Sequence, residues 1–338
     1  TVITNLDQLT EGILIWRALL QWFGGIGIIV FALAILPTLQ IGGMQLLHME
    51  HDDPYEKTLP KINQFIFQII TLYLFFTLIC GIMYFISGMT GFDSIAHAMT
   101  TISTGGFSTH DNSFADFESS YIDLVSIIFM IIGSLPFVIY LKMFHGDYKS
   151  FIKDEQIRLF FIIIFVLITL TTIWMINNFN QNIFYLLRVV TFNIISILTG
   201  TGYTSSNFNL WGGFGLVIMF IIMFIGGCAG STTGGVKIFR LQLLFKGAKT
   251  QIKKLTHPHG VFVTTFNQKI VADDTFNSIM GFFFIYILTF IFSAICLSLF
   301  GIDFLTSISA SASAISNVGP GLGELIGPNG NYNIMPTG

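Results

Sequence analysis

The chain has 338 residues, a net charge of −3, 53% hydrophobic residues and only 10% charged residues. This composition excludes an ordinary soluble domain, because the apolar residues exceed what one core surrounded by water can bury. The small net charge gives no indication of nucleic-acid binding. We therefore predict an all-α integral membrane protein, whose organisation should be visible in the order of its apolar segments.

Six apolar segments each approach the ~20 residues that cross a bilayer as a helix. They cover residues 13–36, 62–87, 120–143, 157–176, 210–226 and 276–300. Three further segments, residues 92–102, 182–198 and 304–315, are too short or too polar to cross comfortably. Each of these leads into a turn rich in glycine, threonine, serine and asparagine. The recurring pattern is a span, a re-entrant pore half-helix, a glycine turn that acts as a filter, and a second span.

The three turns cover residues 103–107, 199–203 and 316–320. Non-helical backbone persists at membrane depth only where protein or a water-filled cavity satisfies its polar groups. Carbonyls in such turns can replace the water around an alkali cation, and the C-terminal ends of the half-helices add negative potential. One turn alone would be an ordinary helix end, but three in matching positions predict a cation pore. Its predicted selectivity-filter residues are Thr104, Gly105, Gly106, Thr201, Gly202, Tyr203, Asn317, Val318 and Gly319, of which Thr104, Thr201 and Asn317 are expected to anchor the turns through side-chain hydrogen bonds.

The pattern recurs roughly every hundred residues, which predicts pseudo-fourfold repeats around one axis. Residues 1–60 would be the remainder of repeat 1, 61–150 repeat 2, 151–260 repeat 3 with a broken inner span, and 261–338 repeat 4. The first repeat would lack its filter and the fourth its last span. We therefore expect further sequence beyond both ends.

The charges predict the orientation. All 15 lysines and arginines except Arg17 and Arg188 fall in three connections, 37–61, 142–158 and 237–269. These connections lie on one side if the six spans alternate, and the positive-inside rule makes that side cytoplasmic. The glycine turns then open toward an acidic external face, which concentrates cations.

A second candidate element follows the span at residues 210–226. Glycine and hydroxyl residues in succession cannot continue a stable helix, so the span is predicted to break, although a simple helix end at the cytoplasmic surface is the alternative. A nucleotide-binding Walker motif is excluded, because the glycines lack an adjoining Gly-Lys-Ser/Thr. The residues of this predicted gating loop are Gly226, Gly227, Ala229, Gly230, Ser231, Thr232, Thr233, Gly234 and Gly235.

Other polar positions have modest interpretations. Residues 237–254 predict a basic amphipathic helix with Ile238, Leu241, Leu244 and Phe245 on one face, suited to membrane lipids or to a cytosolic subunit. His97 is expected to have a hydrogen-bonded packing role. Arg17 and Arg188 should be paired because charges near hydrocarbon are costly, with Asp303 as one partner for Arg188. A solvated turn is expected for the loop residues His48, His51, Asp52 and Asp53.

Residues 224–237, together with 102–109, 198–205, 316–323 and the glycine motif at 22–27, closely resemble the TrkH-type proteins of the Trk/Ktr/HKT potassium-transporter superfamily. The resemblance covers essentially the whole chain. It implies four pseudo-repeats around a pore, with potassium passing Gly105, Gly202 and Gly319 as the filter glycines of repeats 2, 3 and 4. The filter of repeat 1, whose glycine or serine is associated with potassium or sodium preference, would end just before Thr1.

The same resemblance implies a multi-pass protein of the bacterial inner membrane and a loop that obstructs the pore and moves on gating. It also implies a homodimer and a cytosolic nucleotide-binding partner of the TrkA type, with K⁺ as the transported ion and no covalent cofactor. A sodium-selective or mixed cation transporter and a non-conducting membrane subunit remain alternatives. Passive flow and proton- or sodium-coupled symport are both open. An intramembrane enzyme is disfavoured, because it would need paired ionisable groups that the spans almost lack.

Overall fold

The computed structural model describes residues 3–34, 59–117, 119–257, 259–267 and 269–335. Within these residues four helices are long and apolar enough to cross a membrane: α1 (Glu11–Ala34), α4 (Leu59–Ile86), α9 (Glu155–Asn178) and α13 (Asp273–Leu299). Many of their large apolar side chains are exposed, such as Ile86 and Phe165. The predicted all-α membrane architecture is confirmed. The loop containing His48 and Asp53 lies outside the described residues.

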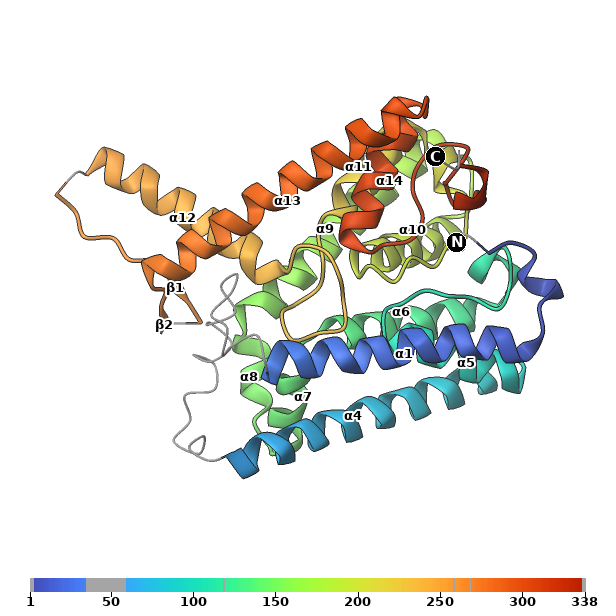
Figure 1. Ribbon diagram of the computed structural model, residues 1–338, viewed down its shortest axis with the longest axis horizontal. Helices are drawn as coiled ribbons and strands as arrows, with labels where there is room; N and C mark the ends of the chain where they lie inside the picture. The colour runs from blue at the N-terminus through green and yellow to red at the C-terminus, as the bar shows by residue number, and fades with distance from the viewer. Residues whose placement is uncertain (1–2, 35–58, 118, 258, 268, 336–338) are drawn as a thin grey trace.

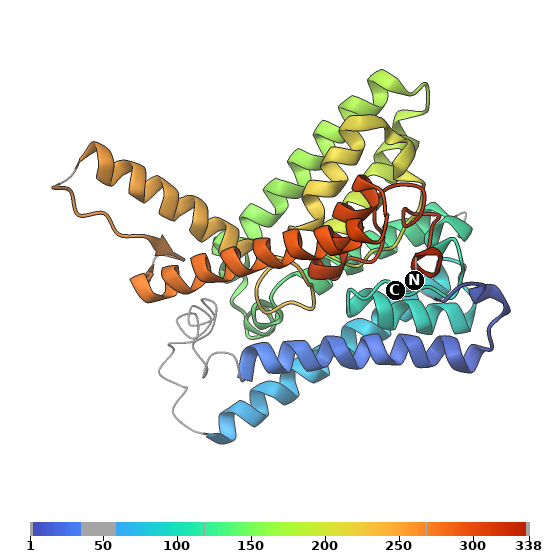
Figure 2. The same ribbon diagram turned by 45° about the horizontal axis from the view of Figure 1, so that its top comes forward.

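The three half-helices are confirmed as α5 (Gly91–Ile102), α10 (Ile183–Leu198) and α14 (Phe304–Ser316). The side chains of Thr90, Asn182 and Asp303 each accept a hydrogen bond from the first turn of the helix they precede, which satisfies amides that have no partner within the helix. Each half-helix packs on the long helix before it in the chain. Figures 1 and 2 show the half-helices together at one end of the molecule, with the residues near both described ends of the chain.

The third predicted span is not continuous. Residues 120–143 form α6 (Ser120–Ser134) and α7 (Phe137–Phe144), which meet at an angle of 93°. The break falls at Leu135 and Pro136. Proline lacks an amide hydrogen and disfavours a helical residue before it, and Leu135 is extended at φ −91° and ψ 158°. The predicted span is therefore bent, a feature that hydropathy alone does not register. The short helix α8 (Tyr148–Lys153) follows α7.

The fifth predicted span is interrupted as expected. After the 3₁₀ turn Phe208–Trp211, α11 (Gly212–Met223) has only 12 residues and ends just before the glycine-rich stretch. The next helix is α12 (Ile238–Thr256), which projects from the end of the molecule opposite to the half-helices (Figure 1). The antiparallel strands β1 (Thr265–Phe266) and β2 (Lys269–Ile270) then lead into α13.

The face of α12 that is buried differs from the predicted apolar face. Phe245 is 74% exposed, whereas Phe239, Leu243 and Gly247 are buried together with Ile238. A side chain at Gly247 would collide with the Phe276 ring of α13. The face is therefore set by the position of α13, which the periodicity of α12 cannot reveal.

Candidate functional site

The three glycine turns contact one another in chain order. A Cβ on Gly106 would collide with the carbonyl oxygen of Thr201, and one on Gly202 would collide with that of Val318. Both glycines also have positive φ, +77° and +81°, which side-chain-bearing residues adopt only with strain. We number the turns by their predicted repeats, so that residues 103–107 are the second turn, 199–203 the third and 316–320 the fourth. The second turn therefore abuts the third, and the third abuts the fourth.

The second turn is held from two sides. Its own helix provides the carbonyl of Thr100, which accepts from the amides of Gly105 at 2.8 Å and Gly106 at 3.3 Å. The neighbouring helix α1 provides Gln21, whose Nε2 donates to the Gly105 carbonyl at 2.5 Å and whose Oε1 accepts from the Phe107 amide at 3.0 Å. We did not predict a role for Gln21. The available signal was an amide side chain within a largely apolar span, four residues after Arg17.

The third turn is anchored by Tyr203. Its ring is fully buried, its hydroxyl forms a 2.5 Å hydrogen bond with Thr100 of α5, and its carbonyl accepts from the Ser196 hydroxyl at 2.7 Å. Thr201 also anchors this turn, through a 2.8 Å hydroxyl contact with Thr199. Tyr203 thus ties the third turn to the second half-helix, and it is Thr201 and Gly202 that line the cavity above.

The fourth turn ends α14 through Asn317, which has a left-handed backbone at φ 57°. Ser313 binds the next two amides: its carbonyl accepts from Val318 at 3.0 Å and its hydroxyl from Gly319 at 3.0 Å. The Tyr332 hydroxyl then donates to the Gly319 carbonyl at 2.9 Å. Burial raises the pKa of the Tyr332 phenol, so it keeps this donor proton at neutral pH.

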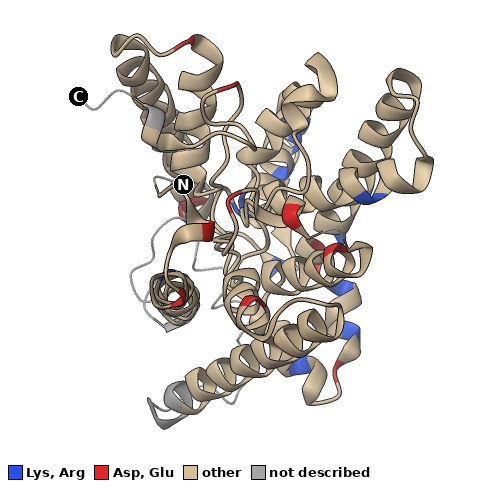
Figure 3. Ribbon diagram, turned by 90° about the vertical axis from the view of Figure 1, so that its right-hand side faces the viewer, with Lys and Arg blue, Asp and Glu red and all other residues tan. Residues whose placement is uncertain are grey.

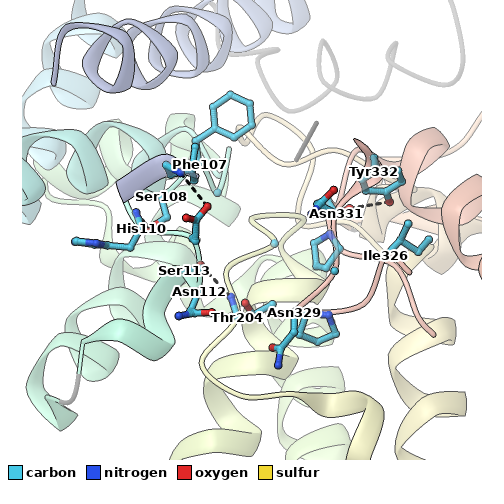
Figure 4. Close-up of a pocket in the computed structure, with 18 of the residues that line it drawn as sticks. Phe107, Ser108, His110, Asn112, Ser113, Thr204, Ile326, Asn329, Asn331 and Tyr332 are labelled. Atoms are coloured by element: carbon cyan, nitrogen blue, oxygen red, sulfur yellow. Dashed lines mark hydrogen bonds between the residues drawn. The ribbon is translucent and has the colours of Figure 1, made fainter. Parts of the chain in front are cut away.

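A cavity of about 370 Å³ opens directly onto the turns. Figure 4 shows its walls, which combine the loop after α5, the segment after the third turn and the residues near Tyr332. Its lining includes Gly105, Gly106, Gly202 and Gly319 from the turns. The cavity is therefore lined by residues from all three turns.

Acidic groups surround this opening. Asp111 lines the cavity, and Asp7 pairs with His110 at 2.7 Å. Figure 3 looks onto this end of the molecule and shows acidic segments close to the N-terminus. One oxygen each of Asp7 and Asp116 and one nitrogen of His110 lie within 4.8 Å of one another, a donor set that divalent cations accept. The Asp7–His110 contact and the Asn112 side-chain amide, which donates to Asp116 at 2.8 Å, account for this arrangement.

The stretch 226–235 lies against the turns on the side away from the cavity. Residues 226–233 are all buried. The Thr232 hydroxyl contacts the Ile102 carbonyl at 3.1 Å and the Thr104 hydroxyl at 3.1 Å, and a Cβ on Gly234 would collide with the Ser316 carbonyl. A helix end at the cytoplasmic surface does not fit such a buried segment.

The bend between α6 and α7 holds the same stretch. The amides of Cys228 and Thr232 donate to the carbonyls of Ser134 at 2.9 Å and Gly133 at 3.2 Å, and the Phe137 amide donates to the Gly230 carbonyl at 3.0 Å. The helix break at Pro136 thus leaves the Gly133 and Ser134 carbonyls and the Phe137 amide available to this loop. Sequence reasoning missed the partnership between these two breaks.

Further support comes from Lys237 at the start of α12. Its ammonium donates to the Thr233 carbonyl, to the Thr233 hydroxyl at 2.9 Å and to the Ser231 hydroxyl at 3.4 Å. The Lys237 side chain therefore closes the end of the glycine-rich stretch that leads into α12.

Arg188 is paired, although not with the predicted partner. Arg188 lies 3.5 Å from Asp123 and donates to Ser120, not to Asp303, because α10 packs on α6. The Arg17 guanidinium lies 4.4 Å from the centroid of the Phe107 ring.

The packing role of His97 is confirmed. Its ring nitrogens contact the Asp93 carbonyl at 2.9 Å and the Ser108 hydroxyl at 3.0 Å, and the imidazole is fully buried. It therefore fixes the loop that follows the second turn.

Comparisons with known proteins agree with this geometry. Residues 1–329 match the family model described as TrkH, cation transport protein. The Trk system potassium uptake protein TrkI of Halomonas elongata is 39% identical over 337 residues, which are 99% of this chain and 68% of that protein. The Trk system potassium uptake protein TrkH of Escherichia coli is 35% identical over 96% of this chain and 68% of its own length. The crystal structure of the potassium transporter TrkH from Vibrio parahaemolyticus superposes with a TM-score of 0.87 at 35% identity, covering 96% of this chain and 67% of that one.

Proposed function

Because this chain belongs to the TrkH family of cation transport proteins, we propose that it takes up potassium across the bacterial inner membrane through a pore at the three glycine turns. Its relatives carry the name of potassium uptake proteins of the Trk system. The chain itself is a multi-pass membrane protein with long apolar helices. Uptake of K⁺ is the function that this membership supports best.

The observation that carries the proposal is the contact between successive turns below one cavity. Gly106 abuts the Thr201 carbonyl and Gly202 abuts the Val318 carbonyl, and this close packing of the turns supports a shared ion pathway. The half-helices end at these turns, and helix C-termini favour a cation. Rings of backbone carbonyls that replace the hydration shell are the usual means of selecting potassium.

Gating is proposed for residues 226–235. Their buried position against Ile102, Thr104 and Ser316 supports the proposal that they lie across the route of an ion leaving the turns. The glycines of this stretch tolerate a wide range of backbone angles, so its backbone can rearrange once its hydrogen bonds break. Displacement of this stretch would open the pore toward the cytoplasm.

Partners are proposed from the exposed part of α12. Phe245, Ile252 and Leu255 are 74%, 63% and 82% exposed, and Lys249 and Lys253 are also exposed on this helix. This mixture suits a cytosolic nucleotide-binding subunit of the TrkA type, with lipid headgroups as neighbours of the lysines. The word system in the names of the relatives fits a component that acts with others. A homodimer is the proposed oligomeric state.

The test is complementation. The natural gene that contains this chain is expressed in a bacterial strain without potassium uptake, and growth at low K⁺ and uptake of radioactive rubidium are measured. Rescue of growth, with K⁺ but not Na⁺ competing against rubidium, is expected. Equal competition by Na⁺ would instead favour a mixed cation transporter. Folded protein that carries no ion in the presence of its partner would favour a non-conducting subunit.

A further inference from the structure

One face of α1 contacts the second turn from Ser103 to Phe107. Arg17, Gln21 and Gly25 are spaced by four residues and so share a helix face. Arg17 stacks on Phe107, Gln21 binds Gly105 and Phe107, and Gly25 would place a Cβ 2.8 Å from the Cβ of Ser103. The three residues thus contact the turn in reverse chain order. This face belongs to the first predicted span, in which the sequence pattern gave no role to Gln21.

Gln21 makes two hydrogen bonds that only a primary amide can make together. Its NH₂ group donates to the Gly105 carbonyl, and its oxygen accepts from the Phe107 amide. The pair bridges the turn and fixes both the direction of the Gly105 carbonyl and the path of the backbone after it. Gly105 would collide with the Gln21 side chain if it carried a Cβ, so the contact is close on both sides.

We infer that Gln21 is a positioning residue that sets the ion preference of the second turn by restraining the Gly105 carbonyl. The inference rests on the proposed function of the turns. Selectivity among alkali cations depends on the number and field strength of the carbonyls that face the ion and on how tightly they are held. A carbonyl released from its amide donor can turn toward the ion and approach it more closely, which favours the smaller Na⁺. Loss of the Gln21 amide should therefore lower discrimination against sodium.

The neighbouring turns use other groups for the same purpose. Tyr332 donates to the Gly319 carbonyl, and Ser196 donates to the Tyr203 carbonyl. These donors come from the chain that follows or precedes the turn within its own repeat. Only the second turn, among the three described, is bridged in this way by a side chain from α1. An effect of Gln21 is consequently expected to be local to the second turn.

The experiment compares Gln21→Leu, which removes both hydrogen bonds, with Gln21→Glu, which has nearly the same shape and keeps an acceptor for Phe107 but loses the donor to Gly105. Rubidium uptake into cells expressing the natural gene is measured with increasing Na⁺ or K⁺ as competitor. Both variants should lower the ratio of K⁺ to Na⁺ potency by roughly fivefold to tenfold, the range that loss of one hydrogen bond supports. The matched control is Gln68→Leu, because Gln68 is exposed on α4 and lines only a shallow apolar pocket.

Two further measurements keep the outcome decisive. The amount of folded protein in detergent separates a loss of selectivity from a loss of protein. If Gln21→Leu does not fold, the competition ratio of the nearly isosteric Gln21→Glu tests the inference. A wild-type competition ratio in a folded Gln21 variant would overturn the inference and leave the pore intact. Unchanged uptake by Gly105→Ala would instead count against the proposed filter itself. The Gln68→Leu variant is expected to keep the wild-type ratio.

Discussion

The glycine turns and the glycine-rich stretch 226–235 are built from similar residues but are held in different ways. Each turn is fixed by a side chain that belongs to a packed helix or loop: Gln21 for the second, Tyr203 for the third and Tyr332 for the fourth. The stretch has three main-chain hydrogen bonds to the bend between α6 and α7, formed by Cys228, Gly230 and Thr232. The side chains of Gln156 and Lys237 also bind it.

This difference indicates which parts of the proposed ion pathway stay fixed. A turn whose carbonyls are oriented by buried side chains cannot change shape without breaking packed contacts in α1, α5 or α10. Main-chain bonds between two loops, in contrast, can be exchanged for bonds to water one at a time. We therefore expect changes in the turns to act on ion binding and changes in the stretch to act on pore opening.

The largest expected effect comes from Gly202→Val. Its Cβ would overlap the Val318 carbonyl, and φ is +81° at this position, so both space and backbone angle exclude a branched side chain. Potassium uptake should be abolished, measured as growth at low K⁺ in a strain without other uptake systems. Gly213→Val is a suitable control, because nothing lies within 4 Å of a Cβ there. Normal growth of the Gly202 variant would refute the assignment of this turn as part of the filter.

Deletion of residues 229–235 tests the other region. The deletion removes the part of the stretch that contacts Ile102, Thr104 and Ser316, so ion flux should rise several-fold while selectivity between K⁺ and Na⁺ is retained. Flux is measured with radioactive rubidium in vesicles containing the purified protein. A fall in flux from a variant that still folds would show that the stretch supports the structure and does not obstruct the pore.

The comparison also shows what the sequence could and could not reveal. The half-helices and turns were predictable, because capping residues such as Thr90 and Asp303 and the glycines at 105, 202 and 319 act locally. The hydrogen bond from Gln21 to Gly105 joins residues 84 positions apart. The periodicity of a helix cannot predict a contact between such distant residues. Pro136 was a readable signal for the bend, but the apolar run around it dominated the interpretation. The side of α12 that is buried depends on Phe276 in α13, so tertiary packing overrode the pattern of that helix.

A smaller effect is expected from Gly319→Ala, which separates space from backbone angle. Its Cβ would meet only the Gly202 Cα, at 4.0 Å, although φ is +113°. The cost is then backbone strain alone, about 1–3 kcal/mol. Uptake should fall but persist, whereas Gly202→Ala, which adds a collision, should lose nearly all uptake. Equal losses in the two variants, measured as rubidium uptake per folded protein, would mean that close contact between the turns is not what limits them.

The smallest expected effect is that of Lys237→Met, which removes the clamp on Thr233 but keeps a long apolar side chain. The stretch then loses the donors to the Thr233 carbonyl and hydroxyl, and its closed form should be weakened by about 1 kcal/mol, which corresponds to a rise in flux of roughly fivefold at most. Lys246→Met is the matched control on the same helix, since Lys246 binds Glu155 and the Thr265 carbonyl and does not contact the stretch. Because the hydrogen bonds of the Lys237 ammonium go to Ser231 and Thr233 of the stretch, the competition ratio between K⁺ and Na⁺ should be unchanged. A variant that altered this ratio without altering flux would show that the stretch and the turns are one rigid unit, and the distinction between a fixed and a movable region would fail.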